Sequence, residues 1–318
     1  PSIVRRMITA LAGGVGAARF LAGLVDAVDP KDVTAIVNTA DDDIFHGLYV
    51  CPDLDSVTYR LAGVANPDTG WGIANETFTT MDALDRYGAP TWFRLGNQDL
   101  ATHLYRTEQL RQGATLSEVT TAITRSWGIA PRVLPMTDAR VTTRITADIN
   151  GEATTFAMQE WFVRERAVPR VIDIAFDGAT AATPAPGVLA AIAAASTIII
   201  CPSNPLISIG PIVAIPAIRS ALVAARDRVV AISPLIAGRA VKGPADHMMA
   251  AQGYDASCVG VAEMYREFCS AFVIDQRDDS RATEVEALGY RVVVTDTLMH
   301  DVRIAAALAQ SALTAIAS

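Results

Sequence analysis

The sequence predicts an α/β fold: a doubly wound, mostly parallel Rossmann-like sheet with an inserted helical and β-hairpin region. Two observations support this prediction. At both ends of the chain, short apolar runs alternate with segments of helical spacing, the pattern of parallel strands joined by crossover helices. The middle of the chain breaks this rhythm and carries a strong hairpin signal at Asn150-Gly151.

The N-terminal part predicts a βαβ unit. Met7 to Ala12 is a short apolar run that ends in glycines, and "GVGAARFLAGLVDAV" follows with apolar residues at helical spacing. Val33 to Asn38 has the pattern of a second buried strand. We expect Pro1 to Arg6 to be a leader before the first strand, and no signal-peptide cleavage site is evident.

The same rhythm returns in the C-terminal part, where four more strands and two helices are predicted. The strands are Ser196–Pro202, Arg228–Ser233, Ser270–Asp275 and Tyr290–Asp296, and the helices lie near Ile212–Ala225 and Asp301–Ala317. Residues 7–62 and 187–318 are therefore predicted to form a nucleotide-binding core.

Residues 63–186 are predicted to be an insertion. Asn75–Gln112 and Leu116–Trp127 are predicted to be helical. Thr142–Phe162 alternates around Asn150-Gly151, which predicts two antiparallel strands joined by a tight turn.

Composition excludes several classes of protein. The chain of 318 residues is 51% apolar with a net charge of -8, so it is an ordinary globular protein without the basic footprint that nucleic-acid binding needs. Its most apolar internal run, Val188–Cys201, is shorter than the ~20 residues of a membrane span. The four cysteines form no CxxC pair, which favours reduced thiols in a cytoplasmic protein.

The glycine loop "GGVGAARF" lies between the first strand and its helix, where backbone N–H groups could bind a phosphate through Gly13, Gly14 and Gly16. It is no dinucleotide fingerprint, because Arg19 takes the third glycine position and Asn38, not an acid, ends the second strand. The alternative is a tight strand–helix turn in which Arg19 pairs with a nearby acid.

Two further loops follow strands of the same predicted sheet. "CPSNPLISIGPI" offers Ser203, Asn204 and Ser208, which could bind an anion or cap the next helix. "SPLIAGRAVKGPA" carries Arg239 and Lys242. Three loops at the same edge of one sheet predict a shared crevice.

The segment Asn38–Asp55, "NTADDDIFHGLYVCPDLD", holds five aspartates in eighteen residues and should lie at the same crevice. Carboxylates this close repel one another unless a cation bridges them, a proton is shared or they point apart. Mg²⁺ bound between these aspartates and a substrate diphosphate would resolve the repulsion. The alternative is solvated Asp42 and Asp43, with Asp53 capping the next helix. His46 could be a base or a ligand, or satisfy a structural hydrogen bond.

Nine segments, in order, resemble the 2-phospho-L-lactate transferases of coenzyme F420 biosynthesis, over nearly all of the chain after Arg6. They are "GGVGAARF", "NTADDD…HG", "CPDLDSVTYRLAG", "GWGIANETF", "LGNQDLATHLYRT", "LPMTDARVTTRI", "QEWFVRERA", "CPSNPLISIGPI" and "SPLIAGRAVKGPA".

The resemblance implies a reaction. A phospholactyl group, or its enolpyruvyl counterpart, moves from a guanosine diphosphate-linked donor to the ribityl hydroxyl of the deazaflavin Fo. GMP leaves, and magnesium is required. A homodimer and an acceptor-binding role for residues 63–186 are also implied.

The resemblance assigns residues as well. Asp55 and Arg94 would contact the deazaflavin, and Asp41, Asp42 and Asp55 would lie at the metal. The glycine loop, Ser203, Asn204, Ser208 and Lys242 would hold the nucleotide. An acid at position 43 departs from the family pattern as we know it, which leaves the role of Asp43 open.

Chemistry adds two expectations. No nucleophilic Ser or Cys lies beside a base in the sequence, which favours direct in-line transfer with Asp55 orienting or deprotonating the hydroxyl. Four aromatic residues could stack on the deazaflavin or pack in the core, namely Trp71, Trp92, Phe93 and Trp161.

The main alternative is a nucleotide-sugar-binding regulatory protein of the same fold, which would keep the glycine and Ser-Asn-Pro loops without an acceptor pocket. A dehydrogenase ranks third, because the dinucleotide fingerprint is incomplete.

Overall fold

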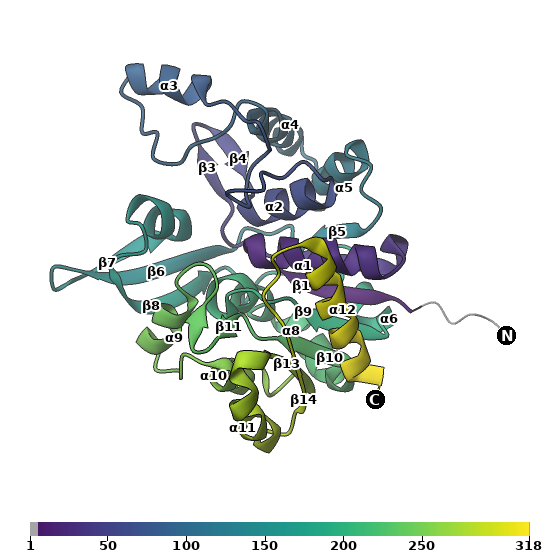
Figure 1. Ribbon diagram of the computed structural model, residues 1–318. Helices are drawn as coiled ribbons and strands as arrows, with labels where there is room; N and C mark the ends of the chain where they lie inside the picture. The colour runs from purple at the N-terminus through teal and green to yellow at the C-terminus, as the bar shows by residue number, and fades with distance from the viewer. Residues whose placement is uncertain (1–5, 318) are drawn as a thin grey trace.

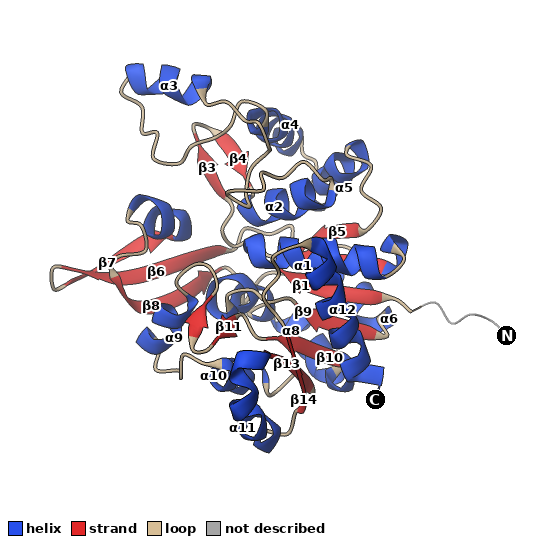
Figure 2. Ribbon diagram, in the orientation of Figure 1, coloured by secondary structure: helices blue, strands red, loops and turns tan. Residues whose placement is uncertain are grey.

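The computed structural model describes residues 6–317 (Figure 1). The predicted leader, Pro1 to Arg6, lies outside the described residues except for Arg6. A central sheet runs through the middle of the molecule, with a helical region above it and a small antiparallel sheet to its left (Figure 2).

The central sheet has seven strands in the order β14-β13-β10-β9-β1-β2-β5, and every pairing in it is parallel. The order reverses between β1 and β9, which confirms the doubly wound prediction and places a topological switch point there. The strands are β1 (Ile8–Ala12), β2 (Val33–Val37), β5 (Arg132–Pro135), β9 (Thr197–Ile200), β10 (Val229–Ile232), β13 (Ala271–Asp275) and β14 (Arg291–Thr295).

Strand β5 was not predicted, although the other six were. It has only four residues and ends in Pro135, and it comes from the range assigned to the insertion. Because β5 lies at the edge of the sheet, a proline there removes no needed ladder hydrogen bond. The sheet is therefore one strand wider than the sequence pattern indicates.

Alternate residues of each strand point into two separate cores. Leu11, Ile36 and Ile200 belong to one core, while their neighbours Ala10, Ala35 and Ile199 belong to the other. Burial on both faces explains why the strands read as continuous apolar runs.

Helices cover both faces of the sheet. The helices that pack on the face of the sheet with Ala10 are α1 (Gly14–Ala27), α2 (Pro52–Leu61), α5 (Leu116–Ser126) and α12 (Val302–Ala317). The helices that pack on the face of the sheet with Leu11 are α6 (Val188–Ala194), α7 (Gly210–Val213), α8 (Pro216–Ala224), α9 (Ala245–Ala251), α10 (Cys258–Tyr265) and α11 (Ala282–Ala287). The helix predicted near Ile212–Ala225 is broken in two, because Pro216 starts a new helix there.

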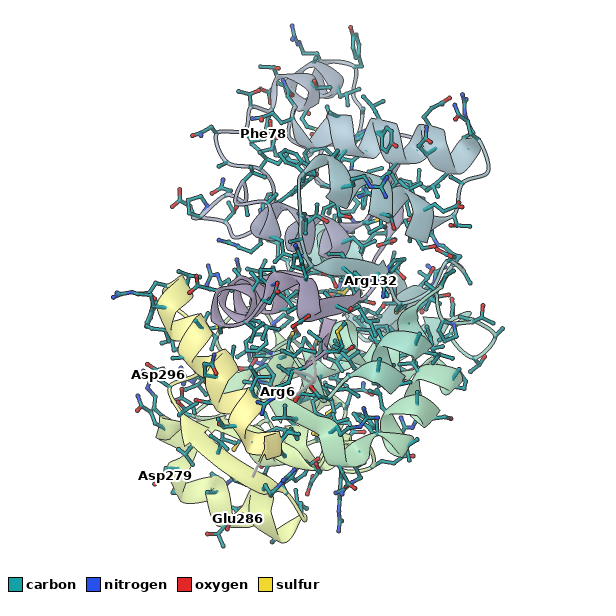
Figure 3. All side chains as sticks on the ribbon, turned by 90° about the vertical axis from the view of Figure 1, so that its right-hand side faces the viewer. Arg6, Phe78, Arg132, Asp279, Glu286 and Asp296 are labelled. Carbon is teal, nitrogen blue, oxygen red and sulfur yellow. The ribbon has the colours of Figure 1, made fainter. Side chains whose placement is uncertain are left out.

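The upper region contains a short hairpin and two more helices. Its elements are β3 (Asp43–Phe45), β4 (Leu48–Val50), α3 (Thr79–Arg86) and α4 (Asp99–Arg111). The prediction of helix over Asn75–Gln112 is confirmed for α3 and α4 but wrong for residues 75–78 and 87–98, which are not helical. Figure 3 shows this region, marked by Phe78, well away from Asp279 and Glu286 of the C-terminal part.

The small antiparallel sheet has the order β7-β6-β8. Its strands are β6 (Thr142–Ile149), β7 (Glu152–Ala157) and β8 (Arg170–Asp177). Asn150 and Gly151 turn the chain with φ values of 55° and 93°, so the predicted two-residue hairpin is confirmed.

The remaining elements are short. They are the strand pair β11 (Leu235–Ile236) and β12 (Arg239–Ala240), the 3-10 turns η1 (Pro30–Asp32), η4 (Arg226–Arg228) and η5 (Gln276–Arg281), and the π turns η2 (Glu160–Arg164) and η3 (Pro205–Ile209).

Among residues 6–317, no single helix has the length and apolarity to cross a membrane. One pair, Pro205–Val213 with Pro216–Ala224, passes that test only when taken together, and it is bent by 89°.

Candidate active site

A cavity of about 1020 Å³ opens at the carboxyl ends of the central strands. The glycine loop after β1, the loop after β9, the first turn of α2 and the loop around Lys242 all contribute to it. Of the eleven residues predicted for the site, ten line it: Gly13, Gly14, Gly16, Asp41, Asp55, Arg94, Ser203, Asn204, Ser208 and Lys242.

Asp42 is the exception, since it does not line the cavity. Its side chain is 1% exposed, and apart from the Cys51 thiol its carboxylate has no hydrogen-bond partner. Burial raises the pKa of Asp42 well above its usual range, with the Cys51 thiol and the Arg106 charge acting in the opposite direction. The structure therefore places Asp42 behind the site rather than in it.

The glycine loop brings α1 into close contact with two other segments. A Cβ on Gly13 would lie 2.7 Å from the Ser208 Cβ and 2.9 Å from an Asp53 oxygen. A Cβ on Gly16 would lie 2.5 Å from the Pro202 carbonyl oxygen. Only glycine fits at these two positions, so the loop is packed tightly against the acidic segment and the Ser-Asn-Pro loop.

The Asp53 carboxylate already occupies the N-terminal end of α1. It accepts a hydrogen bond from the backbone N–H of Gly14 and another, of 2.9 Å, from Asn38 Nδ2. Despite these bonds, burial raises the pKa of Asp53 to about 6. The Asp53 carboxylate therefore lies at the helix end where the sequence predicted that a phosphate would bind.

Asp41 lies beside Asp53 and Asp42 and carries an unpartnered buried oxygen, Oδ1. Burial, followed by the charges of Asp53 and Asp42, raises the pKa of Asp41 well above its usual range. We call Asp41, Asp42, Asp53 and Asp55 the acidic cluster. A bound cation would relieve the repulsion and occupy the open oxygen of Asp41.

Asp55 differs from the other acids because it has a buried cationic partner. Arg106 on α4 pairs with both carboxylate oxygens, through Nη1 to Oδ2 at 3.1 Å and through Nη2 to Oδ1. Arg106 is 2% exposed, and the Asp55 charge raises its pKa although burial acts in the opposite direction. This pairing fixes the orientation of the Asp55 carboxylate.

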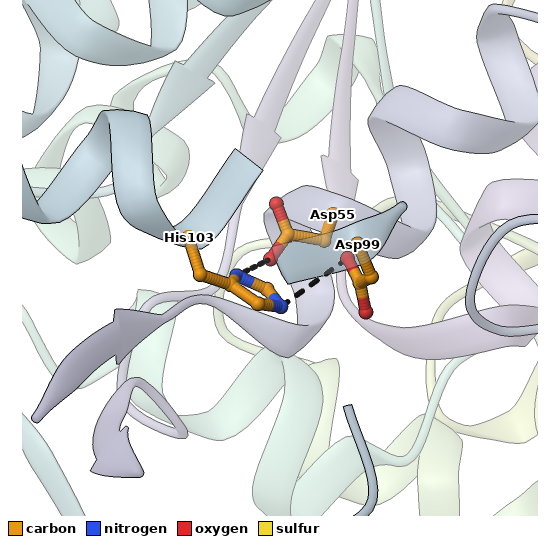
Figure 4. Close-up of side chains that lie close together, drawn as sticks. All are labelled: Asp55, Asp99 and His103. Carbon is orange, nitrogen blue, oxygen red and sulfur yellow. Dashed lines mark ion pairs between the residues drawn. The ribbon is translucent and has the colours of Figure 1, made fainter. Parts of the chain in front are cut away.

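His103 on α4 lies between two carboxylates (Figure 4). Its Nδ1 is 3.7 Å from Asp55 Oδ2, and its Nε2 is 3.2 Å from Asp99 Oδ1. Burial is the largest single influence on the Asp99 pKa and raises it, but the hydrogen bond and charge of His103, the Tyr59 hydroxyl and the Arg106 charge together lower it below its usual value. Ligand atoms of Asp55, Asp99 and His103 lie within 4.8 Å of one another, so these three residues, of which Asp99 is partly exposed, could hold a metal ion.

The sequence analysis missed Asp99, His103 and Arg106. A signal for them exists: intervals of four and three residues put all three side chains on one face of a helix that was predicted. What the sequence does not show is that this face packs against Asp55.

The loop after β9 uses its polar residues in different ways. Asn204 Oδ1 accepts from the backbone N–H groups of Leu206 at 2.9 Å and Ile207 at 3.3 Å, so it caps η3 as the alternative interpretation predicted. Ser203 Oγ is buried and has no hydrogen-bond partner. Because Ser203 lines the cavity, its hydroxyl is available to a ligand there.

Another part of the cavity wall contains Arg94 and several aromatic rings. Arg94 pairs with Asp82 at 2.7 Å and lies over the Phe78 ring at 5.0 Å. Trp71, Trp92 and Phe93 line the cavity. Trp161 does not: it is 1% exposed, packs in the core beneath the small sheet and donates from Nε1 to a backbone carbonyl.

Besides Asp42, His46 and Asp43 of the segment Asn38–Asp55 also lie outside the cavity. His46 is exposed at the β3–β4 turn with φ of 52°, a conformation that His tolerates better than most residues. Asp43 pairs with Arg140 at 3.1 Å. Neither residue lines the cavity, which argues against His46 as a base or ligand.

Residues 8–312 match the family model described as "2-phospho-L-lactate transferase CofD". The chain is 44% identical over 308 residues to a phosphoenolpyruvate transferase of Streptomyces griseus, covering 96% of this chain and 97% of that one. It is 39% identical over 296 residues to a 2-phospho-L-lactate transferase of Methanothermobacter thermautotrophicus, covering 93% and 94%.

A crystal structure of a UPF0052 family protein from Bacillus halodurans has a similar fold. The TM-score is 0.59 at 15% identity, with 97% of this chain and 99% of that chain covered. At this identity the likeness concerns the fold alone.

Proposed function

The chain belongs to the 2-phospho-L-lactate transferase CofD family, and from that premise we propose how its residues carry out the reaction. It is a phospholactyl/phosphoenolpyruvyl transferase of coenzyme F420 biosynthesis that acts on Fo and a nucleotide-linked donor. The cavity at the switch point of the sheet is where such substrates bind in this class of fold.

We propose that the ribityl hydroxyl of Fo attacks the phosphorus that bears the lactyl or enolpyruvyl group. The bond from that phosphorus to the bridging oxygen breaks, and GMP leaves with the bonding electron pair. This direct transfer needs positioning and charge neutralisation more than covalent chemistry by the protein. The cysteines give no reason to expect a covalent intermediate, since all four are buried and free.

Asp55 is our candidate for the residue that orients the attacking hydroxyl and accepts its proton. The observation that supports this role is its setting: Asp55 lines the cavity while Arg106 holds both of its oxygens. Because Arg106 fixes the orientation of this carboxylate, a hydroxyl in the cavity can form a hydrogen bond with it in one geometry only.

We propose that Asp41 and Asp55 hold Mg²⁺, which would neutralise charge on the donor diphosphate. The residues fit such an ion, because Mg²⁺ prefers oxygen ligands and Asp41 Oδ1 is buried without a partner. Asp42, predicted as a third ligand, does not line the cavity and is not proposed to coordinate the metal.

The range 63–186 is proposed to bind the acceptor. It supplies Arg94 and three cavity-lining rings, Trp71, Trp92 and Phe93. A flat tricyclic ring system stacks well on such side chains. The regulatory alternative would need no such pocket, so these rings favour the transferase.

For the donor, we propose the phosphoenolpyruvyl form. Seven of the relatives compared, 39–45% identical to this chain, are named phosphoenolpyruvate transferase, and one, 39% identical, is named 2-phospho-L-lactate transferase. We further propose that the enzyme is a cytoplasmic homodimer, which light scattering after size exclusion would test.

The experiment is turnover with Fo, Mg²⁺ and each guanosine diphosphate-linked donor, followed by mass spectrometry. We expect GMP together with Fo enlarged by one phosphoenolpyruvyl group, formed faster than the phospholactyl product. Binding of Fo without any product from either donor would refute the proposed reaction.

A further inference from the structure

We propose that Arg19, Arg60 and Lys242 form an oxyanion subsite that binds the negatively charged part of the donor. We call these three residues the basic cluster. The inference deepens the proposed function and rests on it, because it names the groups that hold the donor opposite the acidic cluster.

Two of the three cations converge on one point of the cavity wall. A Cβ on Gly70 would lie 3.6 Å from Arg19 Nη2 and 3.6 Å from Lys242 Nζ, and both cations line the cavity. Lys242 Nζ also donates to the backbone carbonyl of Thr69 at 2.5 Å. The loop around Gly70 thus joins a cation from α1 to one from the C-terminal part of the chain.

Arg60, in the last turn of α2, lies close enough to Arg19 for their charges to interact, although Arg60 does not line the cavity. Burial and then the positive charge of Arg19 lower the pKa of Arg60, and the same two causes lower the pKa of Lys242. No carboxylate among the described residues offsets either effect. Arg60 Nε is also buried without a hydrogen-bond partner.

The absence of an acidic partner is unusual in a chain with a net charge of -8. Other arginines near the cavity are paired, such as Arg94 with Asp82 and Arg106 with Asp55. Arg19 was expected to pair with an acid if the glycine loop were only a tight turn, and among residues 6–317 it forms no such pair. Cations that repel one another in a cavity wall are stabilised by a bound anion.

The rest of the site increases the need for this charge. The N-terminal end of α1 is occupied by Asp53, so the glycine loop offers an incoming phosphate less positive potential than its position suggests. Asp41, Asp53 and Asp55 all line the same cavity. A donor that carries a diphosphate and a carboxylate would be repelled from this side unless cations attract it from another.

Two negatively charged groups of the donor could bind to the basic cluster: the diphosphate of the nucleotide and the carboxylate of the transferred group. Arginine can bind either one with two parallel hydrogen bonds. The experiment below separates them.

The test is isothermal titration of GDP, with guanosine as the uncharged probe, into Arg19→Gln, Lys242→Gln and Arg60→Gln in the presence of Mg²⁺. Arg111→Gln is the matched control, because Arg111 is a surface arginine outside the cavity. If the cluster binds the diphosphate, Arg19→Gln and Lys242→Gln each weaken GDP about ten-fold, Arg60→Gln about three-fold, and guanosine binding is unchanged.

If the cluster binds the carboxylate, GDP affinity stays constant while the KM for the donor rises about ten-fold in the same variants. Donor KM and GDP affinity both within two-fold of wild type, in variants that unfold at the wild-type temperature, would overturn the proposal. So would an equal loss of guanosine binding. GDP titration needs neither Fo nor turnover. A failure of the proposed reaction would therefore leave the GDP result unchanged, and the two failures can be told apart.

Discussion

The acidic and basic clusters contrast in how the chain builds them. All four acids come from one segment of fifteen residues, Asp41–Asp55, and two of them start the same helix. The three cations come from α1, the end of α2 and the loop after β12, so they are separated by up to 223 positions, from Arg19 to Lys242. One cluster is visible in the sequence, and the other exists only in the fold.

The clusters also differ in how their charge is balanced. Asp55 has Arg106, and Asp53 has Asn38 and the N–H of Gly14. The basic cluster has one backbone carbonyl, that of Thr69. Asp53 and Asp55 are therefore held in place before a ligand binds, whereas the cations depend on the ligand for their counter-charge.

The largest effect is expected for Asp55→Asn, which keeps the shape of the side chain and removes its charge. If Asp55 accepts the proton and contacts the metal, turnover should fall by a factor of at least about 10³. Steady-state GMP release measures it. Asp43→Asn is the control, because Asp43 pairs with Arg140 outside the cavity, and it should retain activity within about three-fold. An active Asp55→Asn enzyme would remove Asp55 from the chemistry.

Metal removal tests the acidic cluster as a whole. Treatment with a chelator should abolish turnover, and Mg²⁺ should restore it, because the acids and the donor diphosphate would otherwise repel one another. Full activity after exhaustive chelation, verified by metal analysis, would contradict a metal at this cluster.

Arg106→Gln tests whether the Asp55 pair holds the acidic cluster together. Removing one partner of a buried ion pair should lower the free energy of unfolding by about 3–5 kcal/mol. The double variant Asp55→Asn/Arg106→Gln should recover part of that loss, because no unpaired charge remains. Urea unfolding measures both, and equal stabilities of Arg106→Gln and wild type would show that the pair contributes nothing.

The pH dependence of stability should reveal the buried acids. Burial raises the pKa of Asp53 to about 6, from near 4 in an unfolded chain. Between these values the folded state binds the extra proton, so the contribution of Asp53 to stability is fully present below about pH 4 and is lost as pH rises through about 6. Without metal, Asp53 should cost up to about 3 kcal/mol at neutral pH.

Urea unfolding in chelator at pH 5 and pH 7.5 measures this loss, and Asp53→Asn should reduce it. The opposite slope would mean that Asp53 is stabilised as a carboxylate in the fold. Added Mg²⁺ should flatten the slope by offsetting the repulsion.

The smallest effect is expected for His46→Asn. Asn adopts positive φ as readily as His, and His46 is exposed at the β3–β4 turn, so stability should change by less than about 0.5 kcal/mol. Activity should also be unchanged. A loss of turnover with an intact fold would return His46 to the site.

Much of the fold could be predicted, because buried parallel strands leave apolar runs such as Val33–Val37 that no other element explains. β5 could not, since four residues ending in Pro135 carry too little pattern. For the site, ten predicted residues line one cavity, and all of them except Arg94, which lies in the loop 87–98, follow a strand or lie near the start of a helix. His103 and Arg106 were missed because their packing against α2 depends on the tertiary structure. The proximity of Arg19 and Lys242 depends on it in the same way.

The most direct test of the account is a crystal structure with GDP and Mn²⁺ in place of Mg²⁺. We expect an anomalous peak within about 2.3 Å of carboxylate oxygens of Asp41 and Asp55, with the diphosphate between that ion and the guanidinium of Arg19. A nucleotide whose phosphates lie outside the cavity, with no metal at the two aspartates, would contradict the account.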